Sequence, residues 1–339
     1  MKALELMRKE TGIVIPVYLP DDIDTAAGAD LLAENVELCT QQVDDPAWIC
    51  LSVDGEPFGS DVASHLAKQF GVSIRISPEN RGKLQAAAVG VRWLLENKEP
   101  SYIALIDQDG DHFTNELLNF VRTAHTIAAE RKLDRLLLVG RRISRHRPMG
   151  FLRGELEELA DRVLLDALTY RAAVKNRPLQ LEYVTTLDEF PDFHSGYKLF
   201  SQACAKDVFL REPQRAGLSE DAYFRHACEA VMVVEALENG GLLGSVHRTT
   251  VNEQPVSTFG LLDVVQLSSD LILWPCKRLE IPSRFVRQWV INHAPRLLAN
   301  TTPDGKQALH GVIELVEKAF PCEEGLSPSW GQRKLPPFI

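Results

Sequence analysis

Short apolar runs alternate with longer segments of helical periodicity over the first 140 residues. The apolar runs cover residues 12–18, 48–53, 72–77, 102–107 and 135–140. Between them, residues 26–43 and 82–98 carry apolar side chains at intervals of three and four, which is the pattern of amphipathic helices. Buried strands separated by such helices predict a doubly wound, mostly parallel α/β sheet with helices on both faces.

The pattern changes after residue 140. Residues 141–153, "RRISRHRPMGFLR", form a basic connection, which a helical pattern follows to about residue 175. A mixed segment then runs to about residue 255, and residues 256–339 are typical of helices joined by Pro-rich turns. We therefore predict a catalytic domain over residues 1–255, with halves at about 1–140 and 141–255, and a C-terminal helical extension over residues 256–339.

Composition narrows the classes of function. The chain has 339 residues, 45% of them hydrophobic, and 37 basic against 47 acidic residues give a formal charge of −10. This charge argues against binding nucleic acid or anionic membranes. The most apolar late stretch, residues 259–275, contains Asp263 and Asp270, so we expect no transmembrane anchor. The six cysteines form no C-x-x-C pair, which favours free thiols in a reducing cytoplasm; self-association into a homo-oligomer is compatible with the sequence.

Three aspartates at alternate positions, Asp107, Asp109 and Asp111, follow the fourth apolar run in "LIDQDGDHF". A calcium-binding EF-hand loop starting at Asp107 would need Gly and Glu where His112 and Leu118 stand. A turn that only caps the next helix would need a single carboxylate. Because alternate residues of an extended chain share one side, the first two aspartates favour a Mg²⁺ or Mn²⁺ site that also takes phosphate oxygens.

The end of the first strand supports the same interpretation. A dinucleotide-binding fold would continue with G-x-G-x-x-G, whereas this chain continues "PVYLPDD", and no phosphate-binding P-loop motif occurs. Pro16 has no N–H group, so this turn cannot surround a pyrophosphate with amides. A diphosphate would therefore need a metal ion to neutralise it.

Four segments, taken in order, resemble glycosyltransferases of the GT-A fold, family 2, and especially the polyprenyl-phosphate (dolichyl-phosphate mannose synthase-like) branch. "GIVIPVY" resembles the first strand of that family, and "ENRGKLQAAAVG" is similar to its N-x-G-K-x-x-A helix start. "LIDQDGDHF" resembles its D-x-D-G-[QD]-H metal loop, and "DFHSGYKLFSQACAKDV" resembles its acceptor-side D-x-x-S-G-[FY]-[KR] segment. Together these segments span residues 12–208.

The resemblance implies a UDP- or GDP-sugar donor and assigns residues to it. It implies that Asp109 ligates the metal ion and that Asp107 contacts the ribose or a metal-bound water, with Asp111 as a third oxygen ligand. The remaining donor-binding residues implied by the resemblance are Pro16, Val17, Tyr18, Asp54, Asn80, Arg81, Lys83 and Gln108.

The acceptor side both matches the branch and departs from it. The resemblance places Ser195, Gly196, Tyr197 and Lys198 on the acceptor side. The branch usually carries E-S-K after its last core strand, whereas "VHRTTVNEQPVSTFG" has no lysine and contains His247. Other GT-A enzymes with small soluble acceptors supply a histidine ligand from this region, so His247 is a further candidate metal ligand, against the alternative of a surface histidine.

A hydroxyl acceptor would need a carboxylate to take its proton. Glu220 and Asp221 resemble the E-D pair that opens a helix in many family 2 enzymes, and Asp221 is the favoured base, although acids in a first helical turn are common for stability alone. Asp192 is the second candidate. In the basic connection, Arg145 and Arg147 are candidates for holding the diphosphate or an anionic acceptor.

These observations predict a metal-dependent glycosyltransferase that moves a hexose from a nucleotide-diphosphate sugar to a small, soluble acceptor. Three alternatives stay open: a polyprenyl-phosphate glycosyltransferase, a degenerate GT-A domain that only binds nucleotide sugar, and a sugar-phosphate nucleotidyltransferase. The last would carry a Gly/Arg-rich loop after the first strand, and "PVYLPDDIDTAAG" has none.

Overall fold

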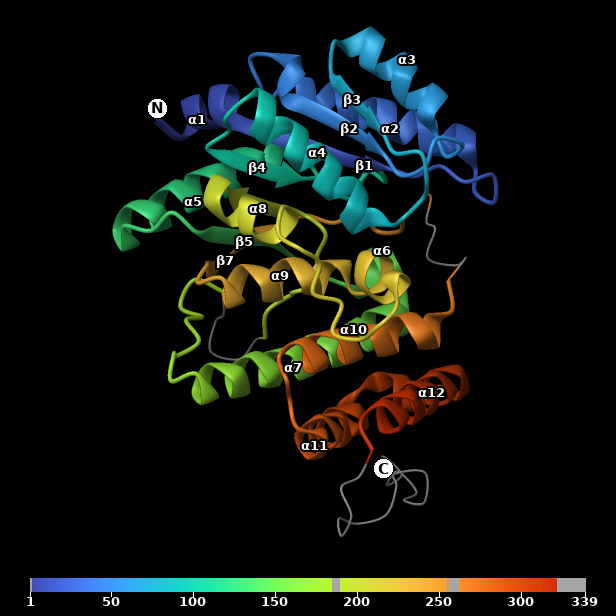
Figure 1. The fold of residues 1–339 in the computed structure, drawn as a ribbon. Coiled ribbons are helices and arrows are strands. Elements are labelled where there is room, and N and C mark those ends of the chain that lie inside the picture. Colours follow the sequence, from blue (N-terminus) through green and yellow to red (C-terminus); the bar gives the residue numbers. More distant parts are fainter. Residues whose placement is uncertain (1, 185–189, 255, 257–261, 322–339) are drawn as a thin grey trace.

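A seven-stranded sheet forms the centre of the molecule (Figure 1). The computed structural model describes residues 2–184, 190–254, 256 and 262–321. The strands lie in the order β3-β2-β1-β4-β6-β5-β7. Their bounds are β1 Thr11–Val17, β2 Ile49–Val53, β3 Ser73–Ile76, β4 Tyr102–Leu105, β5 Leu136–Arg142, β6 Lys198–Ser201 and β7 Leu242–Arg248.

Six of the seven strands run parallel, and β6 is antiparallel to both of its neighbours, β4 and β5. The five strands expected before residue 140 are all present. The sequence did not predict β6, whose four residues lie outside the regular alternation of strands and helices that marks the first 140 residues. The turn that feeds β6 is the "HSGYK" segment, so it enters the sheet beside the strand that carries the aspartates.

Each face of the sheet has its own hydrophobic core, because successive side chains of a strand point to opposite faces. Ile13 and Ile15 of β1 belong to one core, and Val14 between them belongs to the other. Helices α1 Lys2–Glu10, α2 Thr25–Thr40, α3 Ser60–Phe70 and α5 Leu117–Arg131 contribute to the first core. The second core takes α4 Lys83–Asn97, α7 Phe151–Val174, α8 Gln202–Phe209 and α9 Cys228–Glu238.

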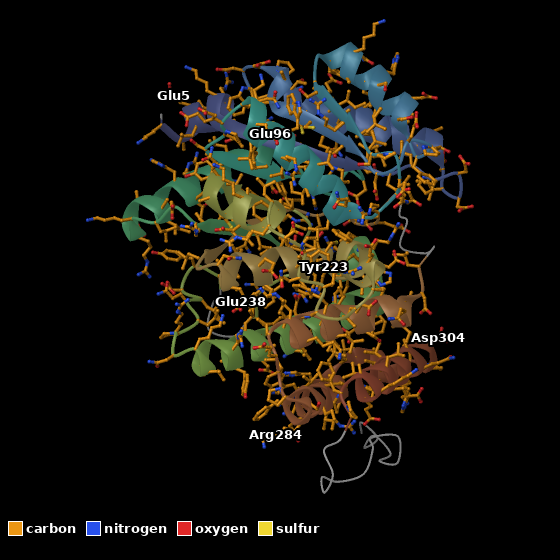
Figure 2. The ribbon with its side chains drawn as sticks, in the orientation of Figure 1. Glu5, Glu96, Tyr223, Glu238, Arg284 and Asp304 are labelled. Atoms are coloured by element: carbon orange, nitrogen blue, oxygen red, sulfur yellow. The ribbon has the colours of Figure 1, made fainter. Side chains whose placement is uncertain are left out.

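The C-terminal helices extend the second core rather than forming a separate one. They are α10 Val264–Arg278, α11 Ser283–His293 and α12 Pro303–Ala319. α10 and α11 pack against α7, α12 packs against α10, and all three lie on the side away from α1 (Figure 1). Tyr223, labelled in Figure 2, packs against Trp274 of α10 with ring centroids 5.6 Å apart. The predicted fold class, a mostly parallel α/β sheet with a C-terminal helical extension, is confirmed.

Short elements complete the described chain. α6 His146–Met149 lies in the basic connection, and η3 Ala222–His226 is a single π-helical turn directly before α9. The remaining turns are η1 Pro46–Trp48, η2 Thr114–Glu116, η5 Ala294–Arg296 and η6 Leu298–Thr301. Across the described ranges, no helix combines the length and the apolar character needed to cross a membrane.

Candidate active site

A pocket of about 550 Å³ opens beyond the carboxyl ends of β1, β2 and β4. This is the edge at which ligands collect in open α/β sheets. Its walls come from the strand ends, from the first turn of α4, from the turn before β6, from η3 and α9, and from α10. Segments that are far apart in the sequence therefore meet at one place.

The charges that line this pocket do not balance. Seven Asp and Glu side chains and five Lys and Arg side chains contribute to its surface. Asp109 is half-buried there, and burial together with the charges of Asp107 and Asp111 raises its pKa to about 6. A nearby cation would stabilise the ionised form of this carboxylate, so Asp107 and Asp109 are the candidate cation ligands of the pocket.

Lys83 lies at the centre of an ion-pair chain beneath the aspartates. Its Nζ is 2.6 Å from Asp107 Oδ1 and 2.7 Å from Glu229 Oε1, and Glu229 also accepts from Lys198 Nζ at 2.5 Å. Burial alone would lower the pKa of Lys83, but Asp107 and Glu229 outweigh it and hold that pKa well above its usual value. Lys83 is therefore a fixed cation that orients Asp107.

Gly196 makes room for this arrangement. A Cβ at this position would come within 3.1 Å of Lys83 Nζ and of His112 Cε1, and closer still to Asp107 Oδ2. His112 Nδ1 in turn accepts a hydrogen bond from the backbone N–H of Asp107 at 2.9 Å. Because Gly196 has no side chain, the S-G-Y-K segment can pack directly against Asp107, Lys83 and His112.

Asp111 does not face the site as a free ligand. Arg248 Nη2 donates to its Oδ2 at 2.9 Å, and the Val251 N–H donates to its Oδ1 at 3.0 Å. The carboxylate fixes the end of β7 against the aspartate loop. This occupation of both oxygens speaks against Asp111 as a third metal ligand.

His247 lies outside the pocket. It is exposed on β7, whereas the next residue, Arg248, is buried and lines the pocket. The cause is the alternation of side chains along a strand, which places neighbours on opposite faces. The predicted metal role of His247 therefore receives no support, and among the described residues no group of three or more His, Cys, Asp or Glu is arranged to hold a metal ion by itself.

The end of β1 forms the wall expected for a nucleotide. Pro16, Val17 and Tyr18 line the pocket, and the Gln108 side chain clamps the backbone of Tyr18. Gln108 Oε1 accepts from the Tyr18 N–H at 2.9 Å, and its Nε2 donates to the Tyr18 carbonyl at 2.6 Å. Gln108 thus joins the aspartate loop to the first strand.

Asp54 also lines the pocket and fixes the start of α4. Its carboxylate accepts from the N–H groups of Arg81 and Gly82 at 2.8 and 2.9 Å. Burial raises the pKa of Asp54, although these two hydrogen bonds oppose the rise. Asn80 and the exposed Arg81 do not line the pocket, so their role in this arrangement is to shape the turn.

The three predicted catalytic carboxylates do not reach the pocket. Glu220 pairs with Arg81 and Arg215, and Asp221, whose side chain is 66% exposed, pairs with Arg225 at 2.7 Å. Neither lines the pocket, because the π-helical turn that follows directs Arg225 and His226 inward instead. Their placement in this structure leaves both acids outside the pocket.

Asp192 is buried and fully engaged. Arg142 donates to it from Nε at 2.8 Å and from Nη2 at 2.5 Å, and the Arg142 backbone N–H donates at 3.0 Å. Burial would raise the pKa of Asp192, but Arg142 and Arg145 reverse this effect and hold it well below its usual range. A carboxylate held so firmly in its ionised form is a poor proton acceptor.

The basic connection contributes different arginines from those predicted. Arg142 and Arg153 line the pocket, whereas Arg145 is paired with Asp161 at 2.7 Å and Arg147 is exposed. Arg145 and Arg147 lie outside the pocket, whereas Met149, at the end of α6, lines it.

Of the four residues placed on the acceptor side, only Gly196 lines the pocket, together with the preceding His194. Ser195, Tyr197 and Lys198 are fully buried. Tyr197 stacks between His112 and Phe120, with ring centroids 5.1 and 4.3 Å away. These buried residues pack behind the pocket lining, and Tyr197 holds the ring of His112 in place.

Several pocket residues were missed from the sequence. They are Arg225, His226, Glu229, Arg248 and Gln254, the last of which donates to Asp109 Oδ2 at 2.7 Å. Glu220 and Asp221 stand in the first turn of the 220–229 segment and face away from the pocket. The His, Arg and Glu side chains of the next two turns line it, and their residue types are the signal in the sequence.

Comparisons with known proteins show similar folds only. No family model and no curated protein matches the chain. A solved structure described as a mycobacterial protein is 16% identical, covers 83% of this chain and 78% of its own, and gives a TM-score of 0.48. TarS 1–349 from S. aureus is 10% identical, with coverages of 92% and 81% and a TM-score of 0.48.

A CMP:2-keto-3-deoxy-manno-octonic acid synthetase complexed with CTP is also similar. It is 10% identical, covers 72% of this chain and 93% of its own, and gives a TM-score of 0.38. No role of any residue here rests on these similarities.

Proposed function

We propose that this protein is a metal-dependent glycosyltransferase of the GT-A type, which transfers a hexose from a nucleotide-diphosphate sugar to the hydroxyl group of a small, soluble acceptor. The observation that carries the proposal is the pair Asp107 and Asp109 at the carboxyl end of β4, inside a pocket that also takes the end of β1. Burial and the neighbouring carboxylates raise the pKa of Asp109, and a bound cation would oppose this rise.

The residues present fit a divalent ion. Asp109 and Asp107 would hold Mg²⁺ or Mn²⁺, which commonly takes one or two carboxylates together with phosphate oxygens and water. When bound, such an ion acts as a Lewis acid that stabilises the charge on a departing diphosphate. The excess of carboxylates in the lining makes this cation necessary, because a diphosphate would otherwise enter a pocket of its own sign.

The remaining residues of the donor side have positioning roles in this proposal. Lys83 holds Asp107 in one orientation through the 2.6 Å ion pair. Gln108 holds Tyr18, and Asp54 holds the first turn of α4, so the walls for the base and the ribose are fixed before the donor arrives. Fixed walls reduce the loss of conformational freedom on binding.

The pairing of the cations favours a hydroxyl acceptor over a lipid phosphate. Each Lys and Arg that the described residues contribute to the pocket has a carboxylate partner: Lys83 with Asp107, Arg142 with Asp192, Arg153 with Glu157, Arg225 with Asp221 and Arg248 with Asp111. A phosphate would have to displace one of these carboxylates. An uncharged hydroxyl compound would not.

Calorimetry tests the proposal directly. We expect UDP or GDP to bind in the presence of Mn²⁺ and to bind at least tenfold more weakly in EDTA. Asp109→Asn should abolish this difference, and Glu37→Gln, an exposed change on α2, should leave it intact. Binding that is equally tight with and without the metal would contradict metal dependence, and the absence of binding by either nucleotide would contradict the proposed function.

A further inference from the structure

One histidine of the pocket is held by a buried carboxylate. His226, the last residue of the π-helical turn η3, lines the pocket, and its Nδ1 is 2.7 Å from Asp270 Oδ2 of α10. Their side chains are 12% and 5% exposed, respectively. π-Helical turns occur often at functional sites, because they shift the side chains that follow by one position.

The partner fixes the tautomer of this histidine. Asp270 accepts from Gln266 Nε2 at 3.1 Å through its other oxygen, so the carboxylate itself is held in place. A carboxylate can only accept, so in the neutral imidazole of His226 Nδ1 carries the hydrogen and Nε2 carries the lone pair. Within the described part of the chain, Nε2 has no hydrogen-bond partner, and it is not closed off from solvent.

His226 lies on the same helical segment as Glu229, which is linked to the aspartates through Lys83. Glu229, three residues later, pairs with Lys83, and Lys83 pairs with Asp107. Leu267 and Leu271, on either side of Asp270 along α10, line the same pocket. His226 therefore lines the same pocket as the ion-pair chain of the proposed donor side and the leucines of α10.

The other histidines of the pocket are not free in this way. His112 uses Nδ1 to accept from the backbone of Asp107. His194 has the same carboxylate support, with Nδ1 2.7 Å from Asp161 Oδ1, but its Nε2 is shielded from solvent and has no partner. Only His226, among the described pocket histidines, combines a buried carboxylate partner with an accessible second nitrogen.

We propose that His226 is the general base of the reaction and that Asp270 is its positioning residue. This inference rests on the proposed function. The acceptor oxygen forms a bond to the anomeric carbon while the bond from that carbon to the diphosphate oxygen breaks, and the electron pair of that bond leaves with the diphosphate. The acceptor proton passes to His226 Nε2 and then to water. A single displacement of this kind inverts the anomeric configuration.

The test uses water as the acceptor, because every donor can be hydrolysed. The probe is whichever of UDP-glucose and GDP-mannose binds to the full-length protein with Mn²⁺, and the readout is the release of nucleotide diphosphate. We expect His226→Gln and His226→Ala to lower kcat by about 10²-fold or more, with the donor KM and the Mn²⁺-dependent affinity unchanged. Added imidazole should restore part of the kcat of His226→Ala.

A matched control is available outside the pocket. His293 also pairs with a carboxylate, through Nε2 with Asp166 at 2.7 Å, but it does not line the pocket. His293→Gln should therefore leave kcat and its response to imidazole unchanged. Asp270→Asn should lower kcat by about tenfold without changing the donor KM, and imidazole should not restore it, because the ring is still present.

The outcomes separate this inference from the proposed function. If His226→Gln binds the donor with Mn²⁺ and keeps its kcat within threefold of the original protein, the base is another group and the proposed function stands. If the unaltered protein binds neither donor, the proposed function fails first. Thermal unfolding of each variant shows whether it is folded, and loss of kcat in His226→Ala without rescue by imidazole, in a folded protein, also contradicts the role of base.

Discussion

At the scale of single residues, Asp109 shows a conflict between function and stability. The ionised carboxylate that would bind a metal ion is the form that destabilises the fold. Its pKa rises from 3.8 to about 6 in the folded chain. In the unfolded chain the carboxyl ionises more readily, so ionisation of Asp109 destabilises the fold above pH 6 and has no effect below about pH 4. The full shift corresponds to about 3 kcal/mol, and the partial exposure of Asp109 to solvent reduces this figure.

We therefore expect Asp109→Asn to raise the Tm at pH 8 in EDTA and to leave it unchanged at pH 4, while Mn²⁺-dependent nucleotide binding is lost. Thermal unfolding between pH 4 and 8, followed by circular dichroism, measures the difference. For the unaltered protein, Mn²⁺ affinity should fall as the pH drops through 6, because the ligand must be deprotonated. A lower Tm of the variant at pH 8 would show that Asp109 is stabilised by its partners rather than strained.

Two adjacent residues of β7 allow a matched comparison. Arg248 is buried and donates to Asp111, whereas His247 is exposed. Removing one partner of a buried ion pair leaves an uncompensated charge, so Arg248→Met should lower the free energy of unfolding by about 3–5 kcal/mol. His247→Ala should change it by less than about 0.5 kcal/mol.

Urea unfolding of both variants measures these free energies, and calorimetry with Mn²⁺ and nucleotide diphosphate measures the site. We expect His247→Ala to bind both as the original protein does. A loss of metal dependence in His247→Ala, with stability unchanged, would restore the hypothesis that this histidine is a metal ligand and would mean that β7 turns when the donor binds.

At the scale of elements, the turn before β6 decides whether the aspartate loop and α4 can meet. A Cβ at position 196 would displace Asp107, Lys83 or His112. We expect Gly196→Ala to weaken Mn²⁺-dependent nucleotide binding by at least tenfold. Gly217→Ala is the control for space, because nothing lies within 4 Å of an added Cβ there, although its φ of +79° disfavours any side chain.

Both variants should lower the Tm, and only Gly196→Ala should change the dissociation constant measured by calorimetry. Equal nucleotide affinities in the two variants would mean that the turn tolerates a methyl group and that the close contact is relieved by movement of the lysine. In that case Gly196 would have no role in shaping the site.

The elements that were predicted correctly are those whose pattern of apolar and polar residues lies within the element itself. The five early strands and α2 and α4 follow from periodicity, and the aspartates at the end of β4 follow from the rule that sites lie at the carboxyl ends of parallel strands. α1 was not predicted, because charged residues interrupt the apolar pattern of "MKALELMRKETG". Its single fully buried residue, Met7, shows how little apolar pattern it carries.

The part of the candidate site that could not be predicted depends on partners distant in the sequence. Asp192 and Asp221 are both acids beside plausible motifs, yet one is neutralised by Arg142 and the other pairs on the surface. The π-helical turn that contains His226 cannot be predicted from a local pattern. A single turn with i to i+5 hydrogen bonds is too short to produce a periodic arrangement of apolar residues. Its partner Asp270 lies 44 residues further on.

At the scale of the whole molecule, the question is whether residues 256–339 form an independent unit. The hydrophobic core on one sheet face includes Val14 of β1, Leu164 of α7 and Trp274 of α10 without interruption. Helices that share a core in this way cannot unfold separately without exposing the apolar side chains of the others. We therefore expect a single cooperative unfolding transition for the full chain.

Calorimetry and two spectroscopic probes check this expectation together. The calorimetric and van't Hoff enthalpies should agree, and tryptophan fluorescence, to which Trp274 of α10 and Trp48 near β2 both contribute, should follow the same curve as far-UV circular dichroism. Mn²⁺ with a bound nucleotide diphosphate should move this whole transition upward, since the pocket takes Leu267 and Leu271 from α10 as well as the strand ends. Two transitions, of which only the later one responds to the ligand, would mean that the extension folds by itself and that α10 is a removable wall of the site.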